Sequence, residues 1–210
     1  MRPCIYCGIR PGKTKDHVPP RCLFDFPLPH NTQRITVPCC EVCRRAGESD
    51  EALYRNLFIS TRESEQNSVA QKLAAKRDKA FDEDFSQVLR AVEHMLPVRV
   101  TTPHGSSIAP AFNFDSPPMH RFVLRMCRAL LHKETNSGFV QCRIQTWKVN
   151  PAPDQREIFK GVPARIISEE FAYAGIFWRG EKVSMWLLNF YQSLEFFAIM
   201  EAEWDQSHGS

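Results

Sequence analysis

The chain has 210 residues, a net charge of +3 and 15 Phe among 43% hydrophobic residues, which predicts one or two globular domains with a sizeable apolar core. No stretch of eighteen apolar residues is present and no apolar leader follows Met1, so we expect neither a membrane span nor a secretion signal. The expected location is cytoplasmic, where closely spaced cysteines bind metals more often than they form disulfides. The mild charge permits nucleic-acid binding without requiring it.

Residues 1–61 are rich in Cys, Pro and turn-forming residues and carry two Cys-x-x-Cys pairs, Cys4/Cys7 and Cys40/Cys43. A short strand at 35–37 is expected to lead into the second pair, and a helix is expected from about Cys40 through Leu57. Four thiolates in two such pairs are a typical ligand set for structural zinc. The pairs are 32 residues apart, so the zinc would hold a small folded-back unit together.

Residues 62–205 are expected to form an α+β domain, helices first and strands afterwards, and residues 206–210 a flexible tail. A polar helix is expected over 64–80, and apolar residues at helical spacing predict helices over 81–96 and 119–132. Pro97 is expected to end the second of these, and 97–118 to be extended and loop-like. Period-two or aromatic runs then predict strands of a mostly antiparallel sheet, at 139–147, 164–167, 171–178, 185–191 and 195–200.

The other four cysteines have their own interpretations. Cys39 competes with Cys40 as a ligand, but it does not stand three positions before Cys43 as a Cys-x-x-Cys turn requires. Cys22 is expected to be an unliganded thiol in a loop. Cys127 and Cys142 fall in the helix and strand patterns and are interpreted as small core residues.

An adjacent carboxylate and imidazole, Asp16-His17, lie between the two cysteine pairs and precede Val18-Pro19-Pro20. The order and spacing of Cys4-Ile5-Tyr6-Cys7, Lys15 to Pro20, and Val37 to Cys43 resemble the HNH endonucleases, which have a zinc-bound ββα (treble-clef) unit. The resemblance covers roughly residues 1–60. It implies that His17 is the general base that activates a water and that Asp16 binds a catalytic magnesium or manganese ion.

One position departs from that family, because Arg44 follows the last cysteine where Asn or His usually supplies a further metal ligand. Arginine cannot bind a cation. Three explanations stay open: an acid such as Glu41, Glu48 or Asp50 replaces the missing ligand; Arg44 clamps the phosphate; or the unit has lost cleavage and kept the fold.

Basic residues around the motif, Lys15, Arg21, Arg44 and Arg45, are candidates for binding a phosphate backbone. The aromatic residues of 147–197 could stack on bases, but we favour a core role for them. The sequence thus predicts an α+β protein that hydrolyses phosphodiester bonds, with DNA as the expected polymer. The alternative is an inactive or partner-activated nucleic-acid-binding module, with the second domain contacting a protein partner or a second copy.

Overall fold

The computed structural model describes residues 2–28, 32, 34–61, 64–83, 85–103, 105–137, 140–178 and 180–203; the predicted tail at 206–210 lies outside them. The largest element is a five-stranded antiparallel sheet in the order β5-β9-β8-β7-β6. Its strands are β5 (Gln141–Val149), β6 (Arg165–Ser168), β7 (Phe171–Trp178), β8 (Val183–Phe190) and β9 (Leu194–Glu203). The mixed helix and sheet composition and the antiparallel sheet confirm the predicted class.

The N-terminal segment forms a small hairpin followed by a helix. Strands β1 (Thr14–Val18) and β2 (Ile35–Cys39) pair antiparallel, and the short 3-10 helix η1 (Arg21–Leu23) lies between them. Helix α1 (Glu41–Ile59) begins directly after Cys40, whose sulfur accepts a hydrogen bond from the Cys43 N–H. The predicted strand and the predicted helix start are both confirmed.

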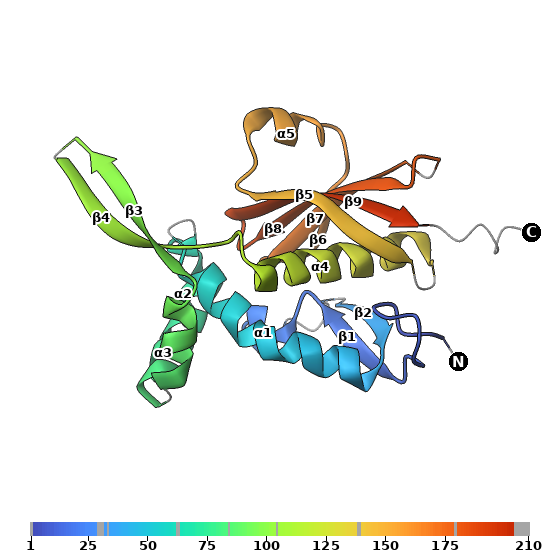
Figure 1. Ribbon diagram of the computed structural model, residues 1–210, viewed down its shortest axis with the longest axis horizontal. Helices are drawn as coiled ribbons and strands as arrows, with labels where there is room; N and C mark the ends of the chain where they lie inside the picture. The colour runs from blue at the N-terminus through green and yellow to red at the C-terminus, as the bar shows by residue number, and fades with distance from the viewer. Residues whose placement is uncertain are drawn as a thin grey trace, which may run out of the picture.

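Helix α4 (Pro117–Thr135) lies between this unit and the sheet (Figure 1). Two prolines occupy its first turn, where their missing N–H groups cost no helical hydrogen bond, and Asn136 ends it in the left-handed conformation. Eight of its residues are buried, so the helix supplies apolar contacts to both neighbouring layers. They are Met119, Phe122, Val123, Met126, Cys127, Ala129, Leu130 and Leu131.

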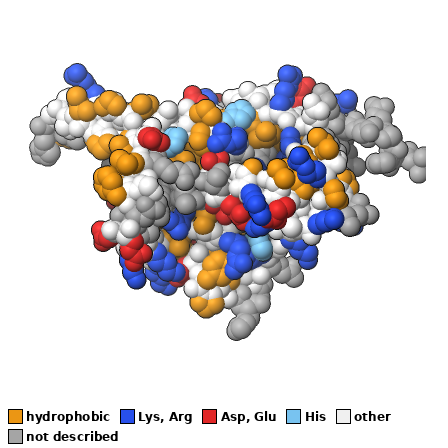
Figure 2. All heavy atoms as spheres, turned by 60° about the horizontal axis from the view of Figure 1, so that its bottom comes forward, with side chains coloured by type: hydrophobic (Ala, Val, Ile, Leu, Met, Phe, Trp, Pro, Cys, Tyr) orange, Lys and Arg blue, Asp and Glu red, His pale blue; other side chains and the backbone are white. Residues whose placement is uncertain are grey.

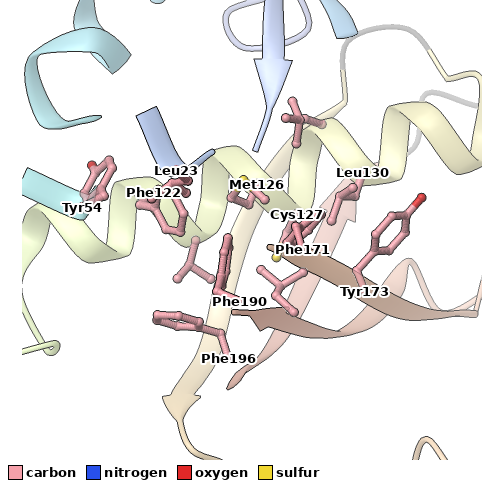
Figure 3. Packing of buried hydrophobic residues seen from close by; sticks show 14 of the residues in the cluster. Leu23, Tyr54, Phe122, Met126, Cys127, Leu130, Phe171, Tyr173, Phe190 and Phe196 are labelled. Atoms are coloured by element: carbon pink, nitrogen blue, oxygen red, sulfur yellow. The ribbon is translucent and has the colours of Figure 1, made fainter. Parts of the chain in front are cut away.

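One hydrophobic core runs through all three layers. The ring of Phe58, from α1, lies 5.0 Å from Phe190 and 5.2 Å from Phe196 of the sheet. Figure 3 shows side chains of α4 meeting the same aromatic residues, among them Phe122, Met126, Phe190 and Phe196. The core therefore contains residues from both predicted domains, and the boundary at residue 61 stays a prediction. The core role expected for the aromatic residues is confirmed for Trp186, Phe190, Phe196 and Phe197, whereas Trp178 is 37% exposed.

The opposite face of the sheet carries a smaller apolar cluster. Phe159 packs there on Phe197, beside the segment that contains α5 (Pro153–Glu157).

The segment between α1 and α4 departs from the prediction. Helices α2 (Ser68–Glu83) and α3 (Phe85–Val92) form, but residues 95–112 make a second hairpin, β3 (Met95–Thr102) and β4 (Gly105–Phe112). The expected helix to residue 96 is therefore wrong at its end, and the segment after it is extended as expected but paired into strands rather than loop-like. Pro97 faces Pro110 across the hairpin, and an isolated pair tolerates both because each strand has an open edge.

This hairpin projects from the body (Figure 1) and exposes apolar side chains, seen in orange at the left of Figure 2. Leu96 is 51% exposed and Ile108 is 75% exposed. Among the described residues, no helix has both the length and the apolar character needed to cross a membrane.

Candidate metal centre and the Asp16–His17 hairpin

The four predicted cysteine ligands come together at one end of the β1–β2 hairpin. The sulfur atoms of Cys4, Cys7, Cys40 and Cys43 all lie within 4.8 Å of one another. Cys4 and Cys40 are buried, while Cys7 and Cys43 are partly exposed. Four thiols at this spacing suit a structural metal ion such as zinc, which takes four sulfur ligands in tetrahedral geometry. The predicted ligand cluster is confirmed as a grouping of side chains.

The turn at the first pair is built to stabilise thiolates. Gly8 adopts φ 67° and donates its N–H to the carbonyl of Cys4 at 2.8 Å, which closes the turn after Cys7. Burial raises the pKa of the Cys7 thiol, but hydrogen bonds from the backbone of Arg10 and Ile9 outweigh it, and the pKa falls to about 6. The deprotonated form that binds metal is thereby favoured.

The remaining cysteines do not join this cluster. Cys39 is buried and its thiol donates to the carbonyl of Cys40 at 3.2 Å. The thiol of Cys22 donates to the carbonyl of Glu51 at 3.2 Å. Cys127 and Cys142 are core residues, as predicted.

Asp16 and His17 lie on opposite faces of the hairpin, because consecutive side chains of a strand alternate. Asp16 pairs in register with Val37, which is 1% exposed, and is itself only 7% exposed. His17 pairs with Thr36, an exposed residue, and is partly exposed. We call the Asp16 side the inner face and the His17 side the outer face.

On the inner face, the Asp16 carboxylate is neutralised by an arginine that sequence reasoning missed. Arg125 of α4 donates to Asp16 Oδ2 from Nη2 at 2.8 Å and from Nε at 3.2 Å. The hydroxyl of Tyr6 donates to the same oxygen at 2.6 Å. The side chains of Arg125 and Asp16 are 19% and 9% exposed, so the pair is largely removed from water.

Arg125 is fixed by further contacts on every side. Its guanidinium stacks 4.0 Å from the centre of the Tyr6 ring and donates to the carbonyl of Cys43 at 2.8 Å. Gly47 of α1 leaves it room, since a Cβ at that position would stand 2.6 Å from Arg125 Cζ. The guanidinium thus connects Asp16 and Tyr6 to the first turn of α1, which contains Cys43.

Arg125 belongs to a row of three arginines on one face of α4, Arg121, Arg125 and Arg128, which we call the arginine row. Arg121 pairs with Asp50 at 2.8 Å. Arg128 donates to the carbonyl of Tyr6 at 2.7 Å and to the carbonyl of Cys142 at 3.1 Å. Their spacing of four and three residues places them on one side of a helix, and that spacing is the sequence signal that could have found them.

A small pocket lies beside Asp16, and a second acid, which is partly exposed, lines it. It has room for about one water, about 10 Å³, and Glu51 and Gly47 line it together with Asp16. Burial, followed by the charge of Asp16, raises the pKa of Glu51. Glu51 was also absent from the predicted site.

The described residues do not show the expected magnesium or manganese site, which stays a prediction. They contain no cluster of three or more possible ligands other than the four cysteines. Asp16 Oδ2 is occupied by Arg125 and Tyr6, and the acids considered as substitutes are paired with arginines: Glu41 and Glu48 with Arg44, and Asp50 with Arg121.

Arg44 and Arg45 lie on the outside of α1. Arg44 binds Glu41 at 2.7 Å and also Glu48, and Arg45 binds Glu41 at 2.9 Å. Figure 2 shows such mixing of Lys and Arg with Asp and Glu on this side of the molecule. Their predicted contact with a phosphate backbone stays a prediction, and it would have to compete with these ion pairs.

On the outer face, His17 is surrounded by positive charge. Burial, and then the charges of Arg34 and Arg21, lower the pKa of His17 below its usual value of 6.5, with Lys15 adding to the effect and Asp16 opposing it. The imidazole is therefore neutral at pH 7 and can accept a proton. Arg21 and Lys15 thus contribute to the positive surroundings of His17, and their predicted contact with a phosphate backbone stays a prediction.

No protein-family model, curated protein or solved structure matches this chain.

Proposed function

We propose that this chain is an HNH-type endonuclease that hydrolyses phosphodiester bonds in nucleic acid at His17, with DNA as the expected polymer. The single observation behind this proposal is the arrangement of the N-terminal unit. A β1–β2 hairpin leads directly into α1, four cysteines gather at its end, and Asp16-His17 lies in its first strand. This is the order of parts that the resemblance to HNH nucleases implies.

The chemistry of His17 supports the proposal. A neutral imidazole can take a proton from a water whose oxygen forms the new bond to phosphorus, while the bond to the leaving sugar oxygen breaks and that oxygen takes a proton from solvent. The basic side chains around His17 would hold the phosphate and offset the charge that develops on it. No part of this scheme uses Asp16 as a metal ligand, because Arg125 occupies its carboxylate.

A nicking assay on supercoiled plasmid tests the proposal with zinc-loaded wild type, His17→Ala and His120→Ala. His120 is an exposed histidine of α4 and serves as the matched control. Each protein is assayed under three conditions: no added divalent ion, added magnesium, and added manganese. No chelator is used, because it would remove the zinc. We expect the His17 variant to lose about 10²–10⁴ in rate and the control to retain it.

Cleavage by the His17 variant at the wild-type rate would show that this histidine is not the base. The three ion conditions also decide whether an added divalent ion contributes.

A second candidate is a module that binds nucleic acid without cutting it, or that cuts only when a partner opens it. The buried pair between Asp16 and Arg125 favours this candidate, because it removes the carboxylate expected to bind a catalytic ion. A wild type that binds plasmid but leaves it intact in all three conditions would support it over the first.

A further inference from the structure

The outer face of the β1–β2 hairpin holds two arginines that share one aromatic ring. The guanidinium carbon of Arg21 lies 4.9 Å from the centre of the Phe26 ring, and that of Arg34 lies 5.4 Å from the same centre. Arg34 also stacks 5.3 Å from the Phe24 ring. Cation–π contacts hold both charged groups in place, close enough that the charge of Arg21 lowers the pKa of Arg34 after burial has done so.

Arg34 has no counterion among the described residues. Its Nε and Nη2 atoms are buried and make no hydrogen bond there. Buried donors without acceptors cost free energy, about 1–3 kcal/mol for each group. Two like charges side by side add to that cost. A bound anion would offset both costs, and the described residues supply none.

Among the described residues, no acid forms an ion pair with Arg21 or Arg34. The sequence from 26 to 40 contains neither Asp nor Glu. Asp25, just before it, is held by Lys76 at 2.6 Å and Lys72 at 3.7 Å. Asp16 points to the inner face and is bound to Arg125.

A polar groove of about 810 Å³ extends from this point toward the edge of the large sheet. Arg34 and Thr36 line one side, and Lys133 and Arg165 line it from α4 and β6. Thr36 is the register partner of His17, so the groove begins one strand away from His17. The one acid in it, Glu134, accepts hydrogen bonds from Tyr173 at 2.6 Å and from Arg165 at 3.4 Å.

We propose that Arg21 and Arg34 form a phosphate-binding site for a nucleic-acid strand, and that the groove with Lys133 and Arg165 takes the neighbouring phosphates. This inference deepens the proposed function, since it assigns the route of the strand past His17. Arginine suits the role because its planar fork matches a phosphate, and the Phe26 ring, 40% exposed, offers a stacking surface for a base.

Binding of a fluorescein-labelled oligothymidylate to the full zinc-loaded chain, measured by anisotropy over a range of salt concentrations, tests this site. The variants are Arg34→Met and Arg21→Met, which keep an apolar stem against the phenylalanine rings. Arg143→Met is the matched control, because Arg143 is an exposed arginine on β5, the opposite edge strand.

We expect each site variant to weaken binding about tenfold at low salt, the effect of losing a charge-assisted hydrogen bond. The slope of log affinity against log salt should fall by about one for each arginine lost. Unchanged binding by Arg34→Met, or an equal loss in the Arg143 control, would overturn the site.

A stability measurement separates anion binding from a structural role. Arg34→Met should melt at the same or a higher temperature than wild type at low salt, because it removes a buried unpaired charge. Added inorganic phosphate should raise the melting temperature of wild type and not of Arg34→Met. A lower melting temperature for the variant in phosphate-free buffer would mark Arg34 as a structural residue and contradict the proposal.

The two proposals can fail separately. Weakened binding by the arginine variants with no cleavage by wild type would remove the nuclease and leave the phosphate site. If Arg34→Met binds and cleaves as well as wild type while His17→Ala loses cleavage, the phosphate site is rejected and the nuclease proposal stands.

Discussion

The two faces of the β1–β2 hairpin differ in how their charges are balanced. On the inner face, Asp16 is matched by Arg125 and Tyr6, and its side chain is 9% exposed. On the outer face, the charges of Arg21 and Arg34 act on His17, and the side-chain contacts of these two arginines among the described residues are with aromatic rings. A set of charges that is already paired holds a structure together, whereas unpaired charges of one sign are suited to an external partner.

The difference changes the meaning of the Asp16-His17 dipeptide. The strand places two adjacent residues of one motif on different faces, so Asp16 has a structural contact while the proposed chemistry rests on His17 alone. Asp16 attaches the hairpin to α4, and His17 is left on the face where a substrate can approach.

Removing the metal should break both faces at once and is the largest effect we expect. Cys40→Ser deletes a ligand from the cluster that closes the hairpin against α1. Structural zinc contributes about 10–16 kcal/mol to the folding of small zinc peptides, so residues 1–61 should lose their ordered structure. Elemental analysis should find about one zinc per wild-type chain and none in the variant.

Hydrogen exchange would then show loss of protection in β1, β2 and α1, with β7–β9 retained. Replacing Cys22, which lies outside the cluster, by Ser is the control and should keep the zinc. An intact hairpin in zinc-free Cys40→Ser protein would contradict the structural role of the metal.

Removing the Asp16–Arg125 ion pair of the inner face should lower the free energy of unfolding by less than removal of the metal does. Arg125→Met leaves the buried Asp16 carboxylate without its charged partner and with only the Tyr6 hydroxyl bonded to it. Such a loss typically costs about 3–5 kcal/mol. Denaturant unfolding at fixed zinc should show this cost, and adding Asp16→Asn should recover much of it. The recovery in the double variant would measure the coupling between the two side chains.

Arg121→Met is the matched control, because Arg121 pairs with Asp50 from a position that is 58% exposed. Water screens the exposed guanidinium of Arg121, so we expect this pair to contribute less than the Arg125 pair, although the Asp50 side chain is only 12% exposed. Equal losses for Arg121→Met and Arg125→Met would show that the inner-face pair is no stronger than this more exposed one.

The sequence predicted the parts of this protein whose signals are local. The spacing of Cys4, Cys7, Cys40 and Cys43 located the metal cluster, and the period-two runs located the strands of the large sheet. The hairpin at 95–112 was missed because Met95 and Leu96 continue the apolar spacing of the preceding helix, and because two prolines argue against strands.

The partner of Asp16 could not be predicted for a different reason. Arg125 lies 109 positions away in the chain, and only the packing of α4 between the two sheets brings it to the hairpin. Its regular spacing with Arg121 and Arg128 indicates a shared helix face, but nothing in the sequence indicates which acid that face meets. The same holds for Glu51, which shares a pocket with residues of α4.

The smallest effect should come from Glu51, the second acid of the inner face. Burial and then the charge of Asp16 raise its pKa above 4.5, with Glu48 acting in the same direction and Arg125 and Arg44 opposing. The folded protein therefore holds this proton more tightly than the unfolded chain. As the pH rises from about 4.5 through the folded pKa, the fold loses stability, and the full cost of the ionised carboxylate remains at neutral pH.

Glu51→Gln removes that cost, so the variant should be more stable than wild type at pH 7, by up to about 1 kcal/mol after solvent screening. The difference should shrink as the pH falls toward 4.5, where wild-type Glu51 is protonated in the folded state. Denaturant unfolding across this pH range gives the measurement, and Glu65→Gln, at an exposed position, is the control. An advantage of the variant that grows toward low pH would reverse the sign and show that the inner face stabilises the charged form of Glu51.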